Sequence, residues 1–159
     1  MTSSVLGRLA ELGLELPEVA APVASYVPAV RTGRYVYTSG QLPFVDGVLA
    51  GTGKVGDGEG LVGPLVAASL ARTAVLNALA AVASQIGSLD QVSRVVKVVG
   101  FVASDPSFTG QPAVVNGASN LLGEIFGEAG VHARSAVGVA VLPLDSPVEI
   151  ELVVELEES

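Results

Sequence analysis

The sequence predicts an α+β fold in which one sheet carries two helices on one of its faces. Two long stretches, 61–86 and 112–127, have helical character, and each ends at or near a glycine. The stretch 148–156 alternates apolar residues with mostly glutamates, which is the period of a strand with one buried face. The stretch 91–104 is β-branched and lies between the two helices. One helix after the first strands and another before the last pair of strands favour a single sheet covered on one side.

The remaining predicted elements are shorter. Residues 3–13 place leucines at helical spacing and stop at Gly13. Strands are predicted at 26–31 and 35–39, joined by a turn at Thr32-Gly33. A glycine-rich loop follows over 41–60, with a short strand near Lys54-Val55. A further strand is predicted at 134–142, and LPLDSP would link it to the last strand as a hairpin. The chain therefore divides into an N-terminal helix and linker, residues 1–20, and one domain, residues 21–159.

Composition limits the classes of function. Half of the 159 residues are hydrophobic and 15% are charged, which favours burial of apolar surface between subunits. The net charge of −8 and the scattered basic residues argue against nucleic-acid binding. The chain has no cysteine, so thiol nucleophiles and thiolate metal sites are excluded. No signal peptide and no uninterrupted apolar run of about 20 residues is visible, so we expect a cytoplasmic protein that does not enter membranes.

Two motifs have ordinary explanations. The segment 51–56, GTGKVG, matches the GxGxxG pattern of dinucleotide-binding proteins, but no clear strand precedes it and no acidic residue follows about twenty positions on. His132 is the only histidine, so a Ser-His-Asp hydrolase would have to use it, yet no GxSxG motif accompanies it. We therefore expect His132 to be a polar residue of the loop before a strand, and we expect no metal site.

Arg134 is the strongest candidate for a functional residue. It opens an apolar strand, where a charge is costly unless it has a partner or a role. Its planar guanidinium group suits the bidentate capture of a carboxylate. The structural alternative is an ion pair with Glu151 or Glu155 on the next strand.

Three blocks of the sequence resemble the RidA (YjgF-type) family. The family's C-terminal signature, an A-R-S strand followed by L-P and V-E-I-E, is similar to HARSAVGVAVLPLDSPVEIELVVEL. Its strand ending in T-S-G-Q-x-P resembles RYVYTSGQLP, and its strand-to-helix passage is similar to LDQVSRVVKVVGFVASDPSFTGQPAVVN. The blocks occur in the family's order and cover about residues 20–157.

The resemblance implies a chorismate-mutase-like fold, assembled as a homotrimer with ligand clefts between subunits. It implies hydrolysis of 2-enamine or 2-imino acids to 2-oxo acids and ammonia, without metal or organic cofactor. By motif matching, Arg134 would grip the substrate carboxylate and Glu149 would position or activate water. The residues that would line the cleft are Ala136 (through its backbone), Tyr26, Ser39, Gly40 and Asn116.

The predicted hairpin adds a geometric expectation. A turn near Leu144-Asp145 would pair Arg134 with about Glu155, leaving Glu149 about 20 Å farther along the sheet. A site shared between subunits could unite Arg134 and Glu149, whereas one subunit could not easily do so. Two further hypotheses remain open: a non-enzymatic module that binds a small carboxylated metabolite, and an endoribonuclease, which the acidic charge disfavours.

Overall fold

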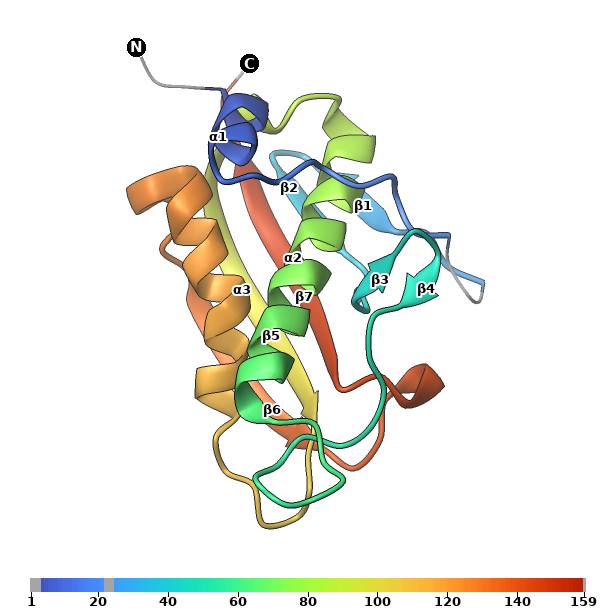
Figure 1. The fold of residues 1–159 in the computed structure, drawn as a ribbon. Helices are drawn as coiled ribbons and strands as arrows, with labels where there is room; N and C mark the ends of the chain where they lie inside the picture. The colour runs from blue at the N-terminus through green and yellow to red at the C-terminus, as the bar shows by residue number, and fades with distance from the viewer. Residues whose placement is uncertain (1–3, 22–24, 159) are drawn as a thin grey trace.

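The computed structural model describes residues 4–21 and 25–158, and it contains one mixed sheet with helices on one side (Figure 1). The main elements in chain order are α1 (Val5–Glu11), β1 (Ala29–Thr32), β2 (Tyr35–Thr38), β3 (Phe44–Val45), β4 (Val48–Leu49), α2 (Pro64–Ile86), β5 (Val92–Ala103), α3 (Gln111–Phe126), β6 (Ala133–Val139) and β7 (Val148–Leu156). Short 3-10 turns occupy Leu89–Gln91, Gly127–Gly130 and Pro143–Asp145. The α+β class and both long helices are confirmed, and the start of the predicted first helix, at Ser3, lies outside the described residues.

The strand order in the main sheet is β1-β2-β7-β5-β6. β5 pairs with β6 in parallel and with β7 antiparallel, so it lies between the two strands that the sequence predicted to be neighbours. The predicted hairpin between β6 and β7 is therefore wrong. The parallel pair β5–β6 is connected through α3, which is the strand–helix–strand crossover that parallel neighbours require.

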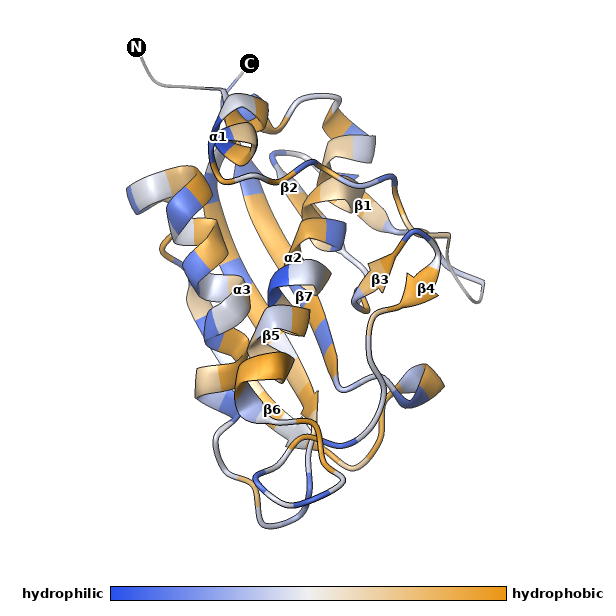
Figure 2. Ribbon diagram, in the orientation of Figure 1, coloured by the Kyte–Doolittle hydropathy of each residue, from blue (hydrophilic) through white to orange (hydrophobic). Residues whose placement is uncertain are grey.

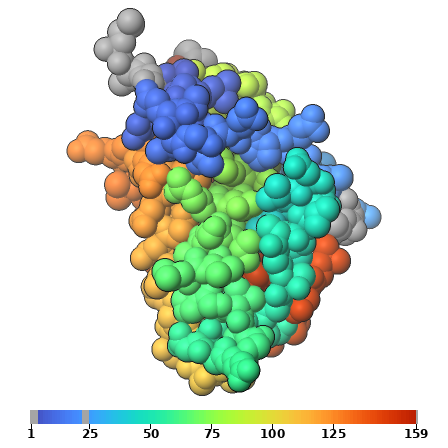
Figure 3. Space-filling model, viewed as in Figure 1, coloured from blue at the N-terminus to red at the C-terminus, as the bar shows by residue number. Residues whose placement is uncertain are grey.

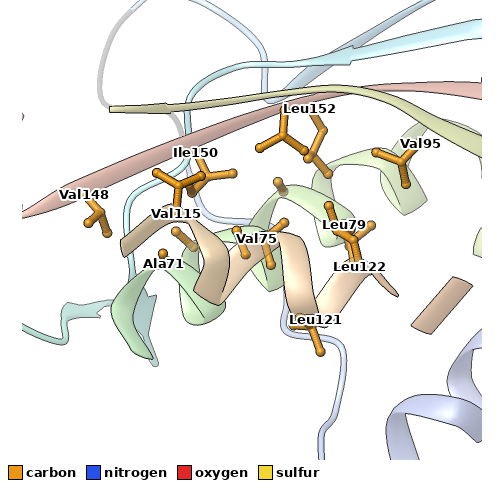
Figure 4. Packing of buried hydrophobic residues seen from close by; sticks show 14 of the residues in the cluster. Ala71, Val75, Leu79, Val95, Val115, Leu121, Leu122, Val148, Ile150 and Leu152 are labelled. Carbon is orange, nitrogen blue, oxygen red and sulfur yellow. The ribbon is translucent and has the colours of Figure 1, made fainter. Parts of the chain in front are cut away.

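Helices α2 and α3 both pack on the same face of the sheet, as predicted. Figure 4 shows residues of α2 (Ala71, Val75, Leu79) and of α3 (Val115, Leu122) packed together beneath the inward side chains of β7 and β5. Along β7 every second residue is buried, from Val148 to Leu156, and the residues between them lie on the opposite, open face. That face has no covering layer among the described residues.

Helix α2 is long and apolar enough to cross a membrane by length and composition alone. Its most apolar window is 61% buried within the protein, however, and Figure 3 shows it running between α3 and the β3–β4 hairpin. Buried Asn77 of α2 donates to the carbonyl oxygens of Leu42 and Phe44, 2.9 and 3.0 Å away, and so fixes the hairpin against the helix. α2 is thus the central core helix of the domain.

The regions before α2 differ in detail from the sequence prediction. The short strands of the glycine-rich region are β3 and β4, which are mainly apolar (Figure 2), whereas Val55 makes only isolated bridges to Val62 and Ser104. The N-terminal helix α1 packs across one end of α3. Leu9 is buried in the core, and the Arg8 Nε–H donates to the carbonyl of Glu124 at 2.7 Å. Residues 5–11 therefore contribute to the same core as the rest of the domain.

Candidate functional site

Arg134 lies on edge strand β6 and points toward α3. It pairs with Val98, whose side chain is buried beneath the helices, so Arg134 shares the helix side of the sheet. Its Nη1 donates to Oδ1 of Asn116 at 2.7 Å and to Oγ of Ser119 at 3.2 Å, and its Nη2 donates to the carbonyl of Pro112 at 3.3 Å. Within the described part of the chain no carboxylate pairs with Arg134, so the predicted ion pair with Glu151 or Glu155 is wrong.

Ser119 and His132 extend this group of polar side chains. Nε2 of His132 lies 2.8 Å from Oγ of Ser119, and Nδ1 lies 2.7 Å from the carbonyl oxygen of Gly130. Both side chains are half-buried. Ala136, two residues beyond Arg134 on β6, packs its methyl group against the core. We call Arg134, Asn116, Ser119 and His132 the arginine cluster.

Glu149 lies on the open face of the sheet. It pairs with Phe101 on β5, next to Gly40 at the end of β2. A Cβ at position 40 would overlap the Glu149 carboxyl group where it now lies, so a larger residue there would force this side chain to turn aside. Burial raises the pKa of Glu149 above its usual value, and the negative charge of Glu151 raises it further. Among the residues that the structure describes, no group donates a hydrogen bond to the side-chain carboxylate of Glu149.

Tyr26 and Ser39 lie close to Gly40, and with Glu149 they form what we call the carboxylate cluster. Tyr26 and Gly40 line a small pocket of about 30 Å³, and a neighbouring one of about 520 Å³ extends toward Asn77. Ser39 anchors the segment, because its hydroxyl donates to the carbonyl of Val27 at 2.6 Å. Tyr26 is 44% exposed and its side chain is accessible to a ligand.

The two clusters do not meet within one subunit. Val98 of β5 pairs with Arg134 on one side and with Leu152 of β7 on the other, so Arg134 and Leu152 lie at the same height in the sheet. Glu149 is three residues away from Leu152 along β7. Two strand spacings and three residues place the two Cα atoms about 14 Å apart, less than the predicted 20 Å. Arg134 also faces the helices, whereas Glu149 faces away from them. The structure thus brings Arg134 together with Asn116, and Glu149 together with Gly40, as two separate groups.

Sequence reasoning missed Ser119, which accepts a hydrogen bond from Arg134, and His132, which contacts Ser119. A signal was present, because Ser119 follows Asn116 by three residues on the same helix face and His132 lies two residues before Arg134, just ahead of β6. The described residues contain no group of three or more His, Cys, Asp or Glu side chains that could hold a metal ion. The arrangement instead offers a cation for a carboxylate and a partly desolvated acid for proton transfer.

Comparison with known proteins gives consistent results. Residues 6–156 match the model of a protein family described as "YjgF/chorismate_mutase-like, putative endoribonuclease". The chain is 44% identical to Protein TCP17 of Trypanosoma cruzi, over 96% of this chain and 94% of that protein. It is 33% identical to a 2-iminobutanoate/2-iminopropanoate deaminase of Dermatophagoides farinae, over 91% of this chain and 95% of that protein. The crystal structure of Atu1372 from Agrobacterium tumefaciens, a protein with unknown function, superposes with a TM-score of 0.87 at 44% identity, covering 96% of this chain and 92% of that one.

Proposed function

The chain belongs to the RidA family of YjgF-like proteins, and we propose that it hydrolyses reactive 2-imino acids and their 2-enamine tautomers to 2-oxo acids and ammonia. The relative from Dermatophagoides farinae that carries the name of such a deaminase supports this reaction. An imine is already electrophilic. The protein therefore needs only to orient the acid and to place one water beside a proton acceptor.

The hydrogen-bond inventory of Arg134 is the observation that carries the proposal. A guanidinium group has five N–H donors, and three hydrogen bonds occupy Nη1 and part of Nη2. The Nε–H and one Nη2–H remain without an acceptor in the described structure. Two adjacent N–H donors match the two oxygens of a carboxylate, so Arg134 is suited to bind the acid group of the substrate.

Glu149 supplies the complementary chemistry. As a carboxylate it accepts a proton from water while the water oxygen adds to the imine carbon. Transfer of that proton from Glu149 to nitrogen gives the carbinolamine. The hydroxyl proton then moves to nitrogen by the same route while the C–N bond breaks, so ammonia leaves and the 2-oxo acid remains. The raised pKa of Glu149 brings its proton affinity closer to that of the groups with which it exchanges protons near neutral pH.

The separation of the two clusters supports a site shared between subunits. A homotrimer that packs the open sheet face of each subunit against its neighbours would cover Tyr37, Val30 and Val137, which are 48%, 53% and 42% exposed. In such an assembly Glu149 of one subunit can meet Arg134 of the next. We propose this trimer as the active form, with a small 2-imino or 2-oxo acid as its ligand and no cofactor.

A binding module is the second candidate, because the free donors of Arg134 alone suffice to hold a carboxylated metabolite. It requires Arg134 and not Glu149. Endoribonuclease activity is less compatible with the surface: the net charge is −8, and a phosphate backbone requires clustered Lys and Arg.

A coupled assay tests the reaction. Imino acids generated in situ from several amino acids would be trapped by semicarbazide in competition with hydrolysis, and the protein should suppress formation of the trapped product. We expect acceleration for at least one small aliphatic 2-imino acid. No acceleration with any of them, together with binding of 2-oxo acids, would favour the binding module.

A further inference from the structure

The groups at the two ends of the arginine cluster, the Arg134 guanidinium and the Gly130 carbonyl, determine which atom donates and which accepts in each of its hydrogen bonds. A carbonyl oxygen only accepts, so a His132 ring that carries one proton has it on Nδ1, which donates to Gly130. Nε2 is then an acceptor, and the hydroxyl of Ser119 donates to it at 2.8 Å. The remaining lone pairs of Ser119 accept the Nη1–H of Arg134 at 3.2 Å. The chain runs in one direction, from Arg134 through Ser119 and His132 to a backbone carbonyl.

The backbone holds the far end of this chain in place. Gly130 is buried, and a Cβ there would collide with the carbonyl of Leu122 on α3, so the segment can approach the helix this closely only with glycine. The carbonyl of Gly130 is therefore a fixed acceptor. His132 orients on it, and the Ser119 hydroxyl orients on His132.

We propose that Ser119 and His132 are positioning residues that orient Arg134 for its ligand. The inference rests on the proposed role of Arg134 as the carboxylate-binding residue. Ser119 and Asn116 both hold Nη1, and this fixes the rotation of the guanidinium plane. The Nε–H and one Nη2–H are the donors that these contacts leave for the ligand. Without the chain from His132, the Ser119 hydroxyl rotates freely and no longer presents a lone pair to Arg134.

The tautomer of His132 gives a direct test on the unmodified protein. His132 is the only histidine in the chain, so its ring nitrogens are assigned without ambiguity in a ¹⁵N spectrum. We expect a protonated Nδ1 and an unprotonated Nε2 at neutral pH. Addition of pyruvate should shift the ring signals in the wild type and leave them unchanged in Arg134→Ala. A protonated Nε2 with a bare Nδ1 would overturn the proposed direction of the chain.

Kinetics and binding test the positioning role. Ser119→Ala and His132→Phe each weaken the hydrogen bond between the Ser119 hydroxyl and the Arg134 guanidinium. KM for the imino acid and Kd for pyruvate should therefore rise about 3- to 10-fold, while kcat changes about 2-fold or less. His132→Gln should restore most of the affinity, because its Oε1 can accept the Ser119 hydroxyl. Asn120→Ala is the matched control on the exposed side of α3, and its kinetics should equal those of the wild type.

The outcomes separate this inference from the proposed function. If Arg134→Ala loses pyruvate binding while Ser119→Ala and His132→Phe bind as the wild type does, Arg134 needs no positioning and the inference is wrong. If Arg134→Ala itself binds pyruvate normally, the ligand site is elsewhere and the proposed function fails. Should a variant not fold, the tautomer of the wild type still decides the direction of the chain.

Discussion

Arg134 is held by neutral acceptors, and this decides what its substitution should do. Arg134→Ala should abolish binding of small 2-oxo acids, since removal of a charged partner from a desolvated cleft costs about 2 to 5 kcal/mol. Arg134→Lys should restore little affinity, because an ammonium group cannot form the bidentate pair. Isothermal titration with pyruvate measures both effects. The fold should survive, because Arg134 pairs with no carboxylate in the described structure; unfolding of Arg134→Ala would mean that its contacts to α3 are mainly structural.

Glu149 leads to a prediction about rate and pH. Glu149→Gln keeps the shape of the side chain and removes its basicity, so imine hydrolysis should fall about 10²- to 10⁴-fold while ligand affinity hardly changes. The carboxylate form is the active one and its pKa is raised, so wild-type kcat/KM should decline on acidification at a pH above the ordinary glutamate value of 4.5.

Glu151 provides the control for Glu149, because it lies on the same strand face and has no matched role. Its charge contributes to the raised pKa of Glu149. Glu151→Gln removes that repulsion, so the acidic decline should move to lower pH while the rate at pH 7 stays nearly constant. Equal loss of rate at pH 7 from both substitutions would instead indicate a general electrostatic effect of an acidic strand.

The candidate residues were accessible from the sequence to different degrees. Arg134 was found from the cost of a charge in an apolar strand, and Asn116, which lies beside it, was found from motif resemblance. Ser119 and His132 were missed because each has an ordinary explanation on its own. Their relation depends on the packing of β6 against α3, which periodicity does not reveal.

At the scale of elements, the contact between α2 and α3 gives a test of close packing. Gly117 lies in the middle of α3, and a Cβ there would collide with the backbone carbonyl of Ala68 on α2. Overpacking against backbone typically costs about 1 to 3 kcal/mol, more than the helix-propensity gain of about 1 kcal/mol for Gly→Ala. Gly117→Ala should therefore lower the free energy of unfolding in urea denaturation.

Gly123 of the same helix is the matched control. A Cβ at position 123 meets no atom within 4 Å, so Gly123→Ala should raise the free energy of unfolding by up to about 1 kcal/mol. Opposite signs for the two substitutions are expected. A stabilising Gly117→Ala would show that the helices separate readily at this contact.

The strands illustrate which information is local. The alternation over 148–156 matched β7 residue for residue, since period and burial are encoded within the segment. The sequence predicted β6 as the neighbour of β7, but the neighbour is β5. The error arose because a segment of the length of LPLDSP can join two adjacent strands and can also pass over the end of a strand that lies between them. The order strand–helix–strand around α3 was the signal for a parallel β5–β6 pair, which leaves β7 to pair on the other side of β5.

At the scale of the whole molecule, the open face of the sheet has no covering layer among the described residues. It exposes Tyr37 and Val30 beside half-buried glutamates, so it offers apolar surface that a subunit interface could bury. Light scattering of the purified protein should give a mass near three chains. A stable monomer at micromolar concentration would contradict both the trimer and the shared site.

Mixed oligomers test directly whether Arg134 and Glu149 act from different subunits. Arg134→Ala and Glu149→Gln should each be inactive alone. An equal mixture of the two variants is unfolded and refolded together so that mixed trimers form. A shared site is then complete when the subunit that supplies Arg134 is the Glu149 variant and the subunit that supplies Glu149 is the Arg134 variant. Random assembly gives that arrangement at about one site in four, so about a quarter of the wild-type rate should return.

The same mixture distinguishes a shared site from one contained in each subunit. If Arg134 and Glu149 of the same subunit had to act together, every subunit in the mixture would still lack one of them and no activity would return. The relative position of the two residues, about 14 Å apart on opposite faces of the sheet, favours recovery. Separately folded variants mixed without denaturation are the control: as long as no subunits exchange, the rate should stay near that of the inactive parents.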